Sequence, residues 1–146
     1  MKKILVPICI HSSPSAIRSA AEEAIAIYRS EDSVQIHLLS VQVPLSRHVA
    51  DFFDGGELRS IHIESGKAEL APVKALLAGA GVPCLTHVEI GRTAETIVQF
   101  ATDIRCDRIV VGQTTQRGWA ERICGTLADE IRHLLGTAGR CRVVVP

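Results

Sequence analysis

The chain has 146 residues, the length of one ordinary domain, and its 16 basic and 16 acidic side chains give a formal net charge of zero. A neutral chain without a basic cluster lacks the concentrated positive charge by which proteins bind the phosphates of nucleic acids. No apolar run reaches the ~18–20 residues that span a bilayer, and the short apolar start contains Pro7 and lacks a signal-peptide cleavage site. We therefore expect a single cytoplasmic domain over residues 1–146, without membrane or nucleic-acid partners.

Five strands alternate with four helices in the hydrophobic pattern. The expected strands cover residues 2–10, 33–43, 81–91, 106–112 and 141–146. The expected helices cover residues 14–30, 57–80, 92–104 and 126–135. Residues 44–56 show no clear period and predict a loop.

Helix boundaries follow from capping residues and prolines. Ser13 is a suitable N-cap, and Pro14 fits the first helical position. Thr93 is the expected cap of the third helix. Pro72 falls inside the second helix, where a proline should kink or split it.

The alternation of strands and helices predicts an α/β fold with a doubly wound, Rossmann-like parallel sheet and helices on both faces. With the strand order 3-2-1-4-5, the order reverses between the first and fourth strands. Ligands of such sheets bind at the carboxyl ends of the strands at this switch point. The chain tips that meet there are PICIHS, residues 7–12, and VVGQTTQRG, residues 110–118.

The loop after the fourth strand has features of a phosphate-binding loop. Gly112 ends the strand, and Gly125 precedes a helix, whose N-terminus attracts anions. Thr126 offers a cap and a hydroxyl donor, and Arg117 and Arg122 would supply positive charge to screen a phosphate. The alternative is a turn, a helix start and solvated arginines, because glycines commonly mark turns. The loop is neither a Walker A motif nor a G-x-G-x-x-G fingerprint.

Four segments together resemble the universal stress protein family: KKILVPI, GRTAETIVQFATDIRCDRIVVG, GTLADEIRHL and the closing CRVVVP. The resemblance covers almost the whole chain and is weakest over about residues 43–80. It implies an adenine-nucleotide-binding fold of the α-hydrolase-like kind and often a homodimer. The family motif is G-x2-G-x9-G followed by Ser or Thr. Gly112, Gly125 and Thr126 match it, Thr115 replaces the middle glycine, and Cys9 stands where the family usually has an acidic residue.

The resemblance implies a binding site for ATP, with Mg²⁺ only as part of the nucleotide complex. The first-strand tip would line the base and ribose, Val41 would offer backbone groups to the adenine, and the glycine-bearing loop would hold the phosphates. The two departures from the motif imply weak binding. The resemblance also implies a homodimer that pairs the C-terminal strands. The implied site residues are Pro7, Ile8, Cys9, Val41, Gly112, Thr115, Gly125, Thr126 and Leu127.

No catalytic or metal-binding set is evident. Cys9 and His11 form a thiol–imidazole pair only if the first strand continues that far. Nucleophilic catalysis also needs a third group that orients the imidazole, and none is apparent in the sequence. The five cysteines include no C-x-x-C pair, which is typical of buried, reduced thiols. Trp119 is interpreted as a packing residue of the loop, with base stacking as the alternative.

Three hypotheses therefore stand. The first is a nucleotide-binding stress or signalling module with at most slow ATP hydrolysis. The second is a dimeric scaffold that no longer binds ATP. The third is a small enzyme of the wider nucleotide α-hydrolase-like group, which the absence of a substrate domain and of a nucleophile–base set disfavours.

Overall fold

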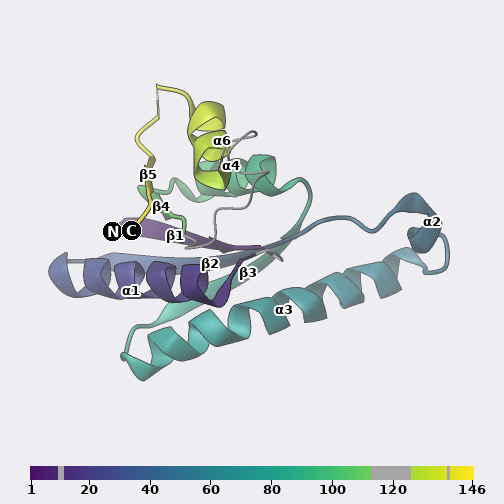
Figure 1. The fold of residues 1–146 in the computed structure, drawn as a ribbon, viewed down its shortest axis with the longest axis horizontal. Helices are drawn as coiled ribbons and strands as arrows, with labels where there is room; N and C mark the ends of the chain where they lie inside the picture. The colour runs from purple at the N-terminus through teal and green to yellow at the C-terminus, as the bar shows by residue number, and fades with distance from the viewer. Residues whose placement is uncertain (10–11, 113–125, 138) are drawn as a thin grey trace.

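The protein folds as a five-stranded parallel sheet in the order β3-β2-β1-β4-β5 (Figure 1). The computed structural model describes residues 1–9, 12–112, 126–137 and 139–146. The strands are β1 Lys2–Ile8, β2 Val34–Gln42, β3 Cys84–Ile90, β4 Arg108–Val110 and β5 Arg142–Val144. All the strand pairs are parallel, so the predicted fold class and strand order are confirmed.

Helices cover both faces of the sheet, as the alternation of elements predicts (Figure 1). The helices within the described residues are α1 Pro14–Ser30, α2 Arg47–Ala50, α3 Gly55–Gly79, α4 Thr93–Ile104 and α6 Leu127–Leu135. One hydrophobic cluster lies between the sheet and α1 with α3, and a second lies between the sheet and α4 with α6. Neighbouring residues of β1 enter opposite clusters, because successive side chains of a strand point to opposite faces. None of the described helices is long and apolar enough to cross a membrane.

Burial follows the position of each strand in the sheet. β1 is buried from Ile4 to Ile8, and β2 is almost wholly buried, as expected for central strands of a covered parallel sheet. β3 lies at an edge and contains only half-buried and exposed residues. β5 forms the opposite edge, as predicted from its short apolar sequence. β4 and β5 are shorter than the predicted strands, because only three residues of each enter the ladder.

The start of α1 confirms the predicted cap. The Ser13 hydroxyl accepts a hydrogen bond from the Ala16 N–H at 3.1 Å, and Pro14 occupies the first turn. By contrast, α4 begins at Thr93 itself, with Arg92 as its N-cap and no capping side chain. The predicted Thr93 cap is therefore wrong, because Arg92 already has the extended conformation from which the helix starts.

The predicted loop over residues 44–56 is wrong in part, because it contains α2 and the first residues of α3. The Ser46 hydroxyl caps α2, and the Asp54 carboxylate caps α3 by accepting from the Glu57 N–H at 2.7 Å. α3 then continues past Pro72 as one helix, so the predicted split does not occur. Pro72 is exposed, whereas Leu70 and Val73 beside it are buried against the sheet, and this packing holds the helix together.

Candidate functional site

The sheet opens at its carboxyl end between β1 and β4. β1 pairs with β2 over seven residues, from Lys2–Val34 to Ile8–Ser40. On its other side, β1 pairs with β4 over two positions only, and the ladder ends at Leu5–Ile109. The last residues of β1 therefore have no strand partner on the β4 side. This is the topological switch point, where parallel sheets of this kind bind ligands.

Gly112 lies directly against the first turn of α1. A Cβ atom added at position 112 would collide with the backbone carbonyl of Ala16. The φ angle of Gly112 is not in the left-handed region, so glycine is needed here for the close approach of two backbones. The contact brings the chain after β4 to the N-terminal end of α1. It also explains this glycine by packing alone, independently of a ligand.

Cys9 lies immediately after β1 and is hydrogen-bonded to Ser12. Its N–H donates to the Ser12 hydroxyl at 3.0 Å, and its carbonyl accepts from the Ser12 N–H at 2.9 Å. β1 covers Lys2–Ile8, and His11, the other member of the possible thiol–imidazole pair, lies outside the described residues. Burial raises the pKa of the Cys9 thiol to about 12, and the nearby charge of Glu69 adds to the effect. A thiol that stays protonated at neutral pH is not an activated nucleophile.

Val41 lies at the carboxyl end of β2 and is buried in the cluster beneath α4. Its neighbours Ser40 and Gln42 point to the opposite face and are also buried. The Ser40 hydroxyl donates to the Glu69 carboxylate of α3 at 2.6 Å, and it accepts from the Gln42 amide at 3.1 Å. Our sequence analysis missed Glu69. The available signal was the pair of polar residues, Ser40 and Gln42, at the carboxyl end of a strand whose unbroken apolar stretches predict burial.

The N-terminus of α6 is closed by a capping box. The Thr126 hydroxyl accepts from the Asp129 N–H at 3.2 Å, and the Thr126 N–H donates to the Asp129 carboxylate at 3.3 Å. These bonds lower the pKa of Asp129, whose carboxylate is therefore charged at neutral pH. The first N–H groups of a helix have no partner within it. The N–H groups of Leu127 and Ala128 are thus the donors that this helix end can offer to an anion.

The implied site residues fall into two groups. Pro7, Ile8, Cys9, Val41 and Gly112 lie at the carboxyl ends of β1, β2 and β4. Thr126 and Leu127 lie at the start of α6, and Leu127 packs on the same hydrophobic cluster as Cys9. Thr115 and Gly125 lie outside the described residues, as do Arg117, Trp119 and Arg122.

A cleft of about 610 Å³ lies between the N-terminal turn of α4 and one side of α6. Its lining includes the side chains of Arg92, Glu95, Asp129, Glu130 and His133. Three of these are carboxylates, so the cleft does not favour a phosphate. In the part of the chain that the structure describes, no group of three or more His, Cys, Asp or Glu side chains is arranged to hold a metal ion.

Two histidines form a hydrogen-bonded pair beneath α4, away from the switch point. His37 Nδ1 and His87 Nε2 are 2.9 Å apart, and His37 Nε2 is 2.9 Å from Gln35 Oε1. His87 also contacts the ring of Phe100. Burial lowers the pKa of both histidines, and each is therefore held as neutral imidazole. His37 is buried within the sheet, and His87 is half-buried on the edge strand β3.

The sequence model of the universal stress protein family matches residues 1–135. The chain belongs to the universal stress protein family. The predicted family resemblance is thereby confirmed, although Thr115 and Cys9 depart from the family pattern. No curated protein sequence matches the chain.

Solved universal stress proteins share the fold over almost the whole chain. UspA from Lactobacillus plantarum is 20% identical, with a TM-score of 0.65 over 99% of this chain and 96% of that one. A family protein from Arabidopsis thaliana with AMP bound is 19% identical, with a TM-score of 0.63 over 99% and 90%. The universal stress protein from Archaeoglobus fulgidus in complex with dAMP is 16% identical, with a TM-score of 0.63 over 98% and 97%. At these identities the likeness establishes the fold alone.

Proposed function

We propose that this universal stress protein is a nucleotide-binding module of the stress response that binds an adenine nucleotide weakly at the carboxyl end of its sheet. The observation that carries the proposal is the early end of the β1–β4 ladder, which leaves the tip of β1 without a strand neighbour at the switch point. Relatives of the same fold have been solved with AMP and with dAMP, which supports an adenine nucleotide as the ligand.

In this proposal the nucleotide extends from β2 towards α6. The base lies near Val41, the ribose lies near the tip of β1, and the phosphates lie near the loop after β4. The N–H group of Leu127 and the hydroxyl proton of Thr126 bind phosphate oxygens, because a capping hydroxyl that accepts one bond still has a proton to donate. The proposed contact residues are Pro7, Ile8, Cys9, Val41, Gly112, Thr115, Gly125, Thr126 and Leu127.

Weak binding follows from the two departures from the family motif. Thr115 places a β-branched side chain where the family has glycine, and Cys9 supplies no charge at the end of β1. We expect an affinity for Mg-ATP that is micromolar or poorer. Binding without further chemistry is the proposed role, with at most slow hydrolysis, because no activated nucleophile is present among the described residues at the switch point.

A ligand-free dimeric scaffold is the second candidate function. Two observations favour it: Gly112 is explained by its contact with Ala16, and the capping box already binds the N–H groups of Thr126 and Asp129. Both features would persist in a protein that had lost its ligand. In either case we propose that two copies pair through β5, an edge strand of the sheet.

Calorimetric titration of the purified protein separates the two candidates. The protein is first denatured and its supernatant is analysed by mass spectrometry for a co-purified adenine nucleotide. Mg-ATP and AMP are then titrated up to millimolar concentration into protein freed of nucleotide. Saturable heat with either ligand supports the nucleotide-binding module. No heat with either ligand, together with a nucleotide-free supernatant, supports the scaffold.

A further inference from the structure

A polar chain links β2 to α3 at the carboxyl end of the sheet. Ser40 lies opposite Ile8, the last residue of β1, in the β1–β2 ladder. The Ser40 hydroxyl donates to Glu69 Oε2 at 2.6 Å, although its own side chain is fully buried. The Gln42 amide donates to the same hydroxyl oxygen. The carboxylate of Glu69 is therefore held at the carboxyl end of β2, beside the tip of β1.

Glu69 is brought there by close packing of α3 on the sheet. A Cβ atom added at Gly66 would lie 2.6 Å from both methyl groups of Val88 on β3. Glycine at this position lets the helix approach the strands, and Glu69 follows one turn later on the adjoining part of the helix. Ser40 then fixes the rotamer of Glu69 without being accessible to a ligand.

The carboxylate of Glu69 retains unused acceptor capacity. An ionised carboxylate has two oxygens and about four lone-pair positions. Within the described ranges, the Ser40 hydroxyl is the one hydrogen-bond donor to Glu69, and no cationic side chain pairs with it. Glu31 differs, since it is paired with both Arg108 and Lys2. A partly buried carboxylate with a single neutral donor favours a ligand that brings further O–H or N–H donors.

The ribose hydroxyls fit this requirement best among the parts of a nucleotide. A phosphate is repelled by the carboxylate. The adenine amine has its donors on a single atom, whereas the ribose diol presents two neighbouring O–H groups to two carboxylate oxygens. Cys9, at the tip of β1, is a half-buried thiol that its raised pKa keeps neutral, and it is a poor acceptor for either hydroxyl.

We propose that Glu69 binds the 2′- and 3′-hydroxyls of the nucleotide's ribose and so selects ribonucleotides. This assignment rests on the proposed nucleotide-binding function. Glu69 is the specificity-determining residue, and Ser40 and Gln42 position it. The acceptor for the sugar therefore comes from α3, an element on which the family motif places no residue.

The test combines a variant with a change in the ligand. Glu69→Gln keeps the size of the side chain and an oxygen that accepts from Ser40, but removes the charge. Glu64→Gln is the matched control, because Glu64 lies on the same helix and makes an exposed ion pair with Lys67. AMP, 2′,3′-dideoxy-AMP and IMP are titrated calorimetrically into all three proteins, and circular dichroism confirms that each variant is folded.

We expect the unaltered protein to bind dideoxy-AMP about ten- to a hundredfold more weakly than AMP, the range for hydrogen bonds to a charged group. Glu69→Gln should lose a similar factor for AMP and show little further loss for dideoxy-AMP. Glu64→Gln should behave like the unaltered protein. The ratio of AMP to IMP affinity should be the same in all three proteins.

Equal binding of AMP and dideoxy-AMP by the unaltered protein would overturn the assignment. This comparison uses only the unaltered protein, so it does not depend on the folding of a variant. A preference for AMP over dideoxy-AMP that persists in Glu69→Gln would also overturn it. A preference for AMP over IMP that disappears in Glu69→Gln would assign Glu69 to the base amine instead. If the unaltered protein binds neither AMP nor Mg-ATP, the proposed function itself fails, and the assignment falls with it.

Discussion

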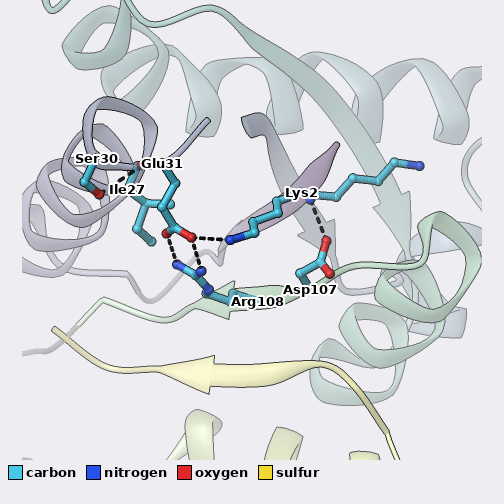
Figure 2. A network of polar contacts seen from close by, with 7 residues as sticks. Lys2, Ile27, Ser30, Glu31, Asp107 and Arg108 are labelled. Atoms are coloured by element: carbon cyan, nitrogen blue, oxygen red, sulfur yellow. Dashed lines mark hydrogen bonds and ion pairs between the residues drawn. The ribbon is translucent and has the colours of Figure 1, made fainter. Parts of the chain in front are cut away.

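Arg108 and Glu31 form a doubly hydrogen-bonded ion pair that joins β4 to the end of α1 (Figure 2). The two guanidinium nitrogens lie 2.5 and 2.6 Å from the two carboxylate oxygens, and Lys2 of β1 adds a third bond at 2.7 Å. The pair lies at the amino end of the sheet, opposite the switch point. Nearby, the Asp107 carboxylate accepts from the Lys3 N–H at 2.8 Å. These contacts hold β1 and β4 together at the amino end of the sheet, whereas the two strands stop pairing before its carboxyl end.

The Arg108–Glu31 pair predicts a specific acid dependence of stability. The hydrogen bonds from Arg108 and then Lys2 lower the pKa of Glu31 from 4.5 to about 2. A carboxyl group whose pKa is lowered by folding stabilises the protein above its unfolded pKa and loses this effect as the pH falls. Glu31→Gln should therefore destabilise the protein at pH 7, and its difference from the unaltered protein should shrink between about pH 4.5 and pH 2.

Urea unfolding at a series of pH values measures this difference. Glu22→Gln on the exposed side of α1 is the control and should change little at any pH. An effect of Glu31→Gln that is the same at pH 7 and pH 2.5 would exclude the ion pair as its cause.

The histidine pair predicts a second loss of stability at a higher pH. Burial lowers the pKa of His37 and His87 below the ordinary value of 6.5. The charges of His87 and Lys3 lower the pKa of His37 further, whereas Glu89 opposes the shift at His87. The unfolded chain then binds protons first, so stability should fall as the pH drops below about 6.5. His87→Gln keeps a hydrogen-bonding group opposite His37 but does not titrate. We expect a smaller loss of stability between pH 7 and pH 5.5 in this variant, measured by thermal unfolding.

The exposed His48 of α2 offers the matched control. His48→Gln should retain the pH dependence of the unaltered protein. If His48→Gln and His87→Gln reduce the dependence equally, the buried pair is not its source.

The contact between Gly112 and Ala16 predicts that Gly112→Ala is destabilising. The new methyl group meets backbone atoms, which cannot move aside as a flexible side chain would. We expect a loss of about 1–3 kcal/mol in the free energy of unfolding, the usual cost of overpacking. Gly79→Ala at the end of α3 is the control, because an added Cβ there has no atom within 4 Å, and it should be neutral or slightly stabilising. Chemical denaturation of both variants tests the contact. Equal stability of Gly112→Ala and Gly79→Ala would contradict it.

The edge position of β5 predicts its role in assembly. The strand is three residues long and its outer side has no partner within the described chain. A bare edge of this kind is prone to pairing with another strand. A chain that ends before Arg142 should give monomer or aggregate in light scattering, whereas the full chain should be a dimer. Val145→Glu keeps the strand and places like charges near the two-fold axis, so it should weaken the dimer. A truncated chain that remains a well-behaved dimer would rule out pairing through β5.

The fold could be predicted because the central strands are identified by their local hydrophobic pattern alone. The unbroken apolar run of β1 indicates burial on both faces, and Ser13 with Pro14 marks the start of α1. α2 was missed because a helix of four residues with none buried leaves no hydrophobic period. The continuity of α3 through Pro72 depends on packing against the sheet, which a local rule for proline does not include.

The candidate site was predictable only where the family motif marks it. The switch point follows from the strand order, and Thr126 from its capping pattern. Glu69 is 29 residues from Ser40 in the sequence, and their hydrogen bond exists only because α3 folds onto β2. Similarly, the contact between Gly112 and Ala16 joins segments that are far apart in the chain. Such tertiary contacts have no counterpart in local sequence.

The central claim, a phosphate-binding loop weakened at Thr115, is tested most directly by titrating Mg-ATP into the unaltered protein, Thr115→Gly and the neighbouring control Thr114→Gly. Both calorimetry and the fluorescence of Trp119, the only tryptophan, report binding. If the family's glycine at this position has a positive φ, a β-branched residue there costs roughly 1–2 kcal/mol. Thr115→Gly should then bind Mg-ATP about five- to thirtyfold more tightly than the unaltered protein, and Thr114→Gly should not. No heat from any of the three proteins at millimolar Mg-ATP would contradict the account.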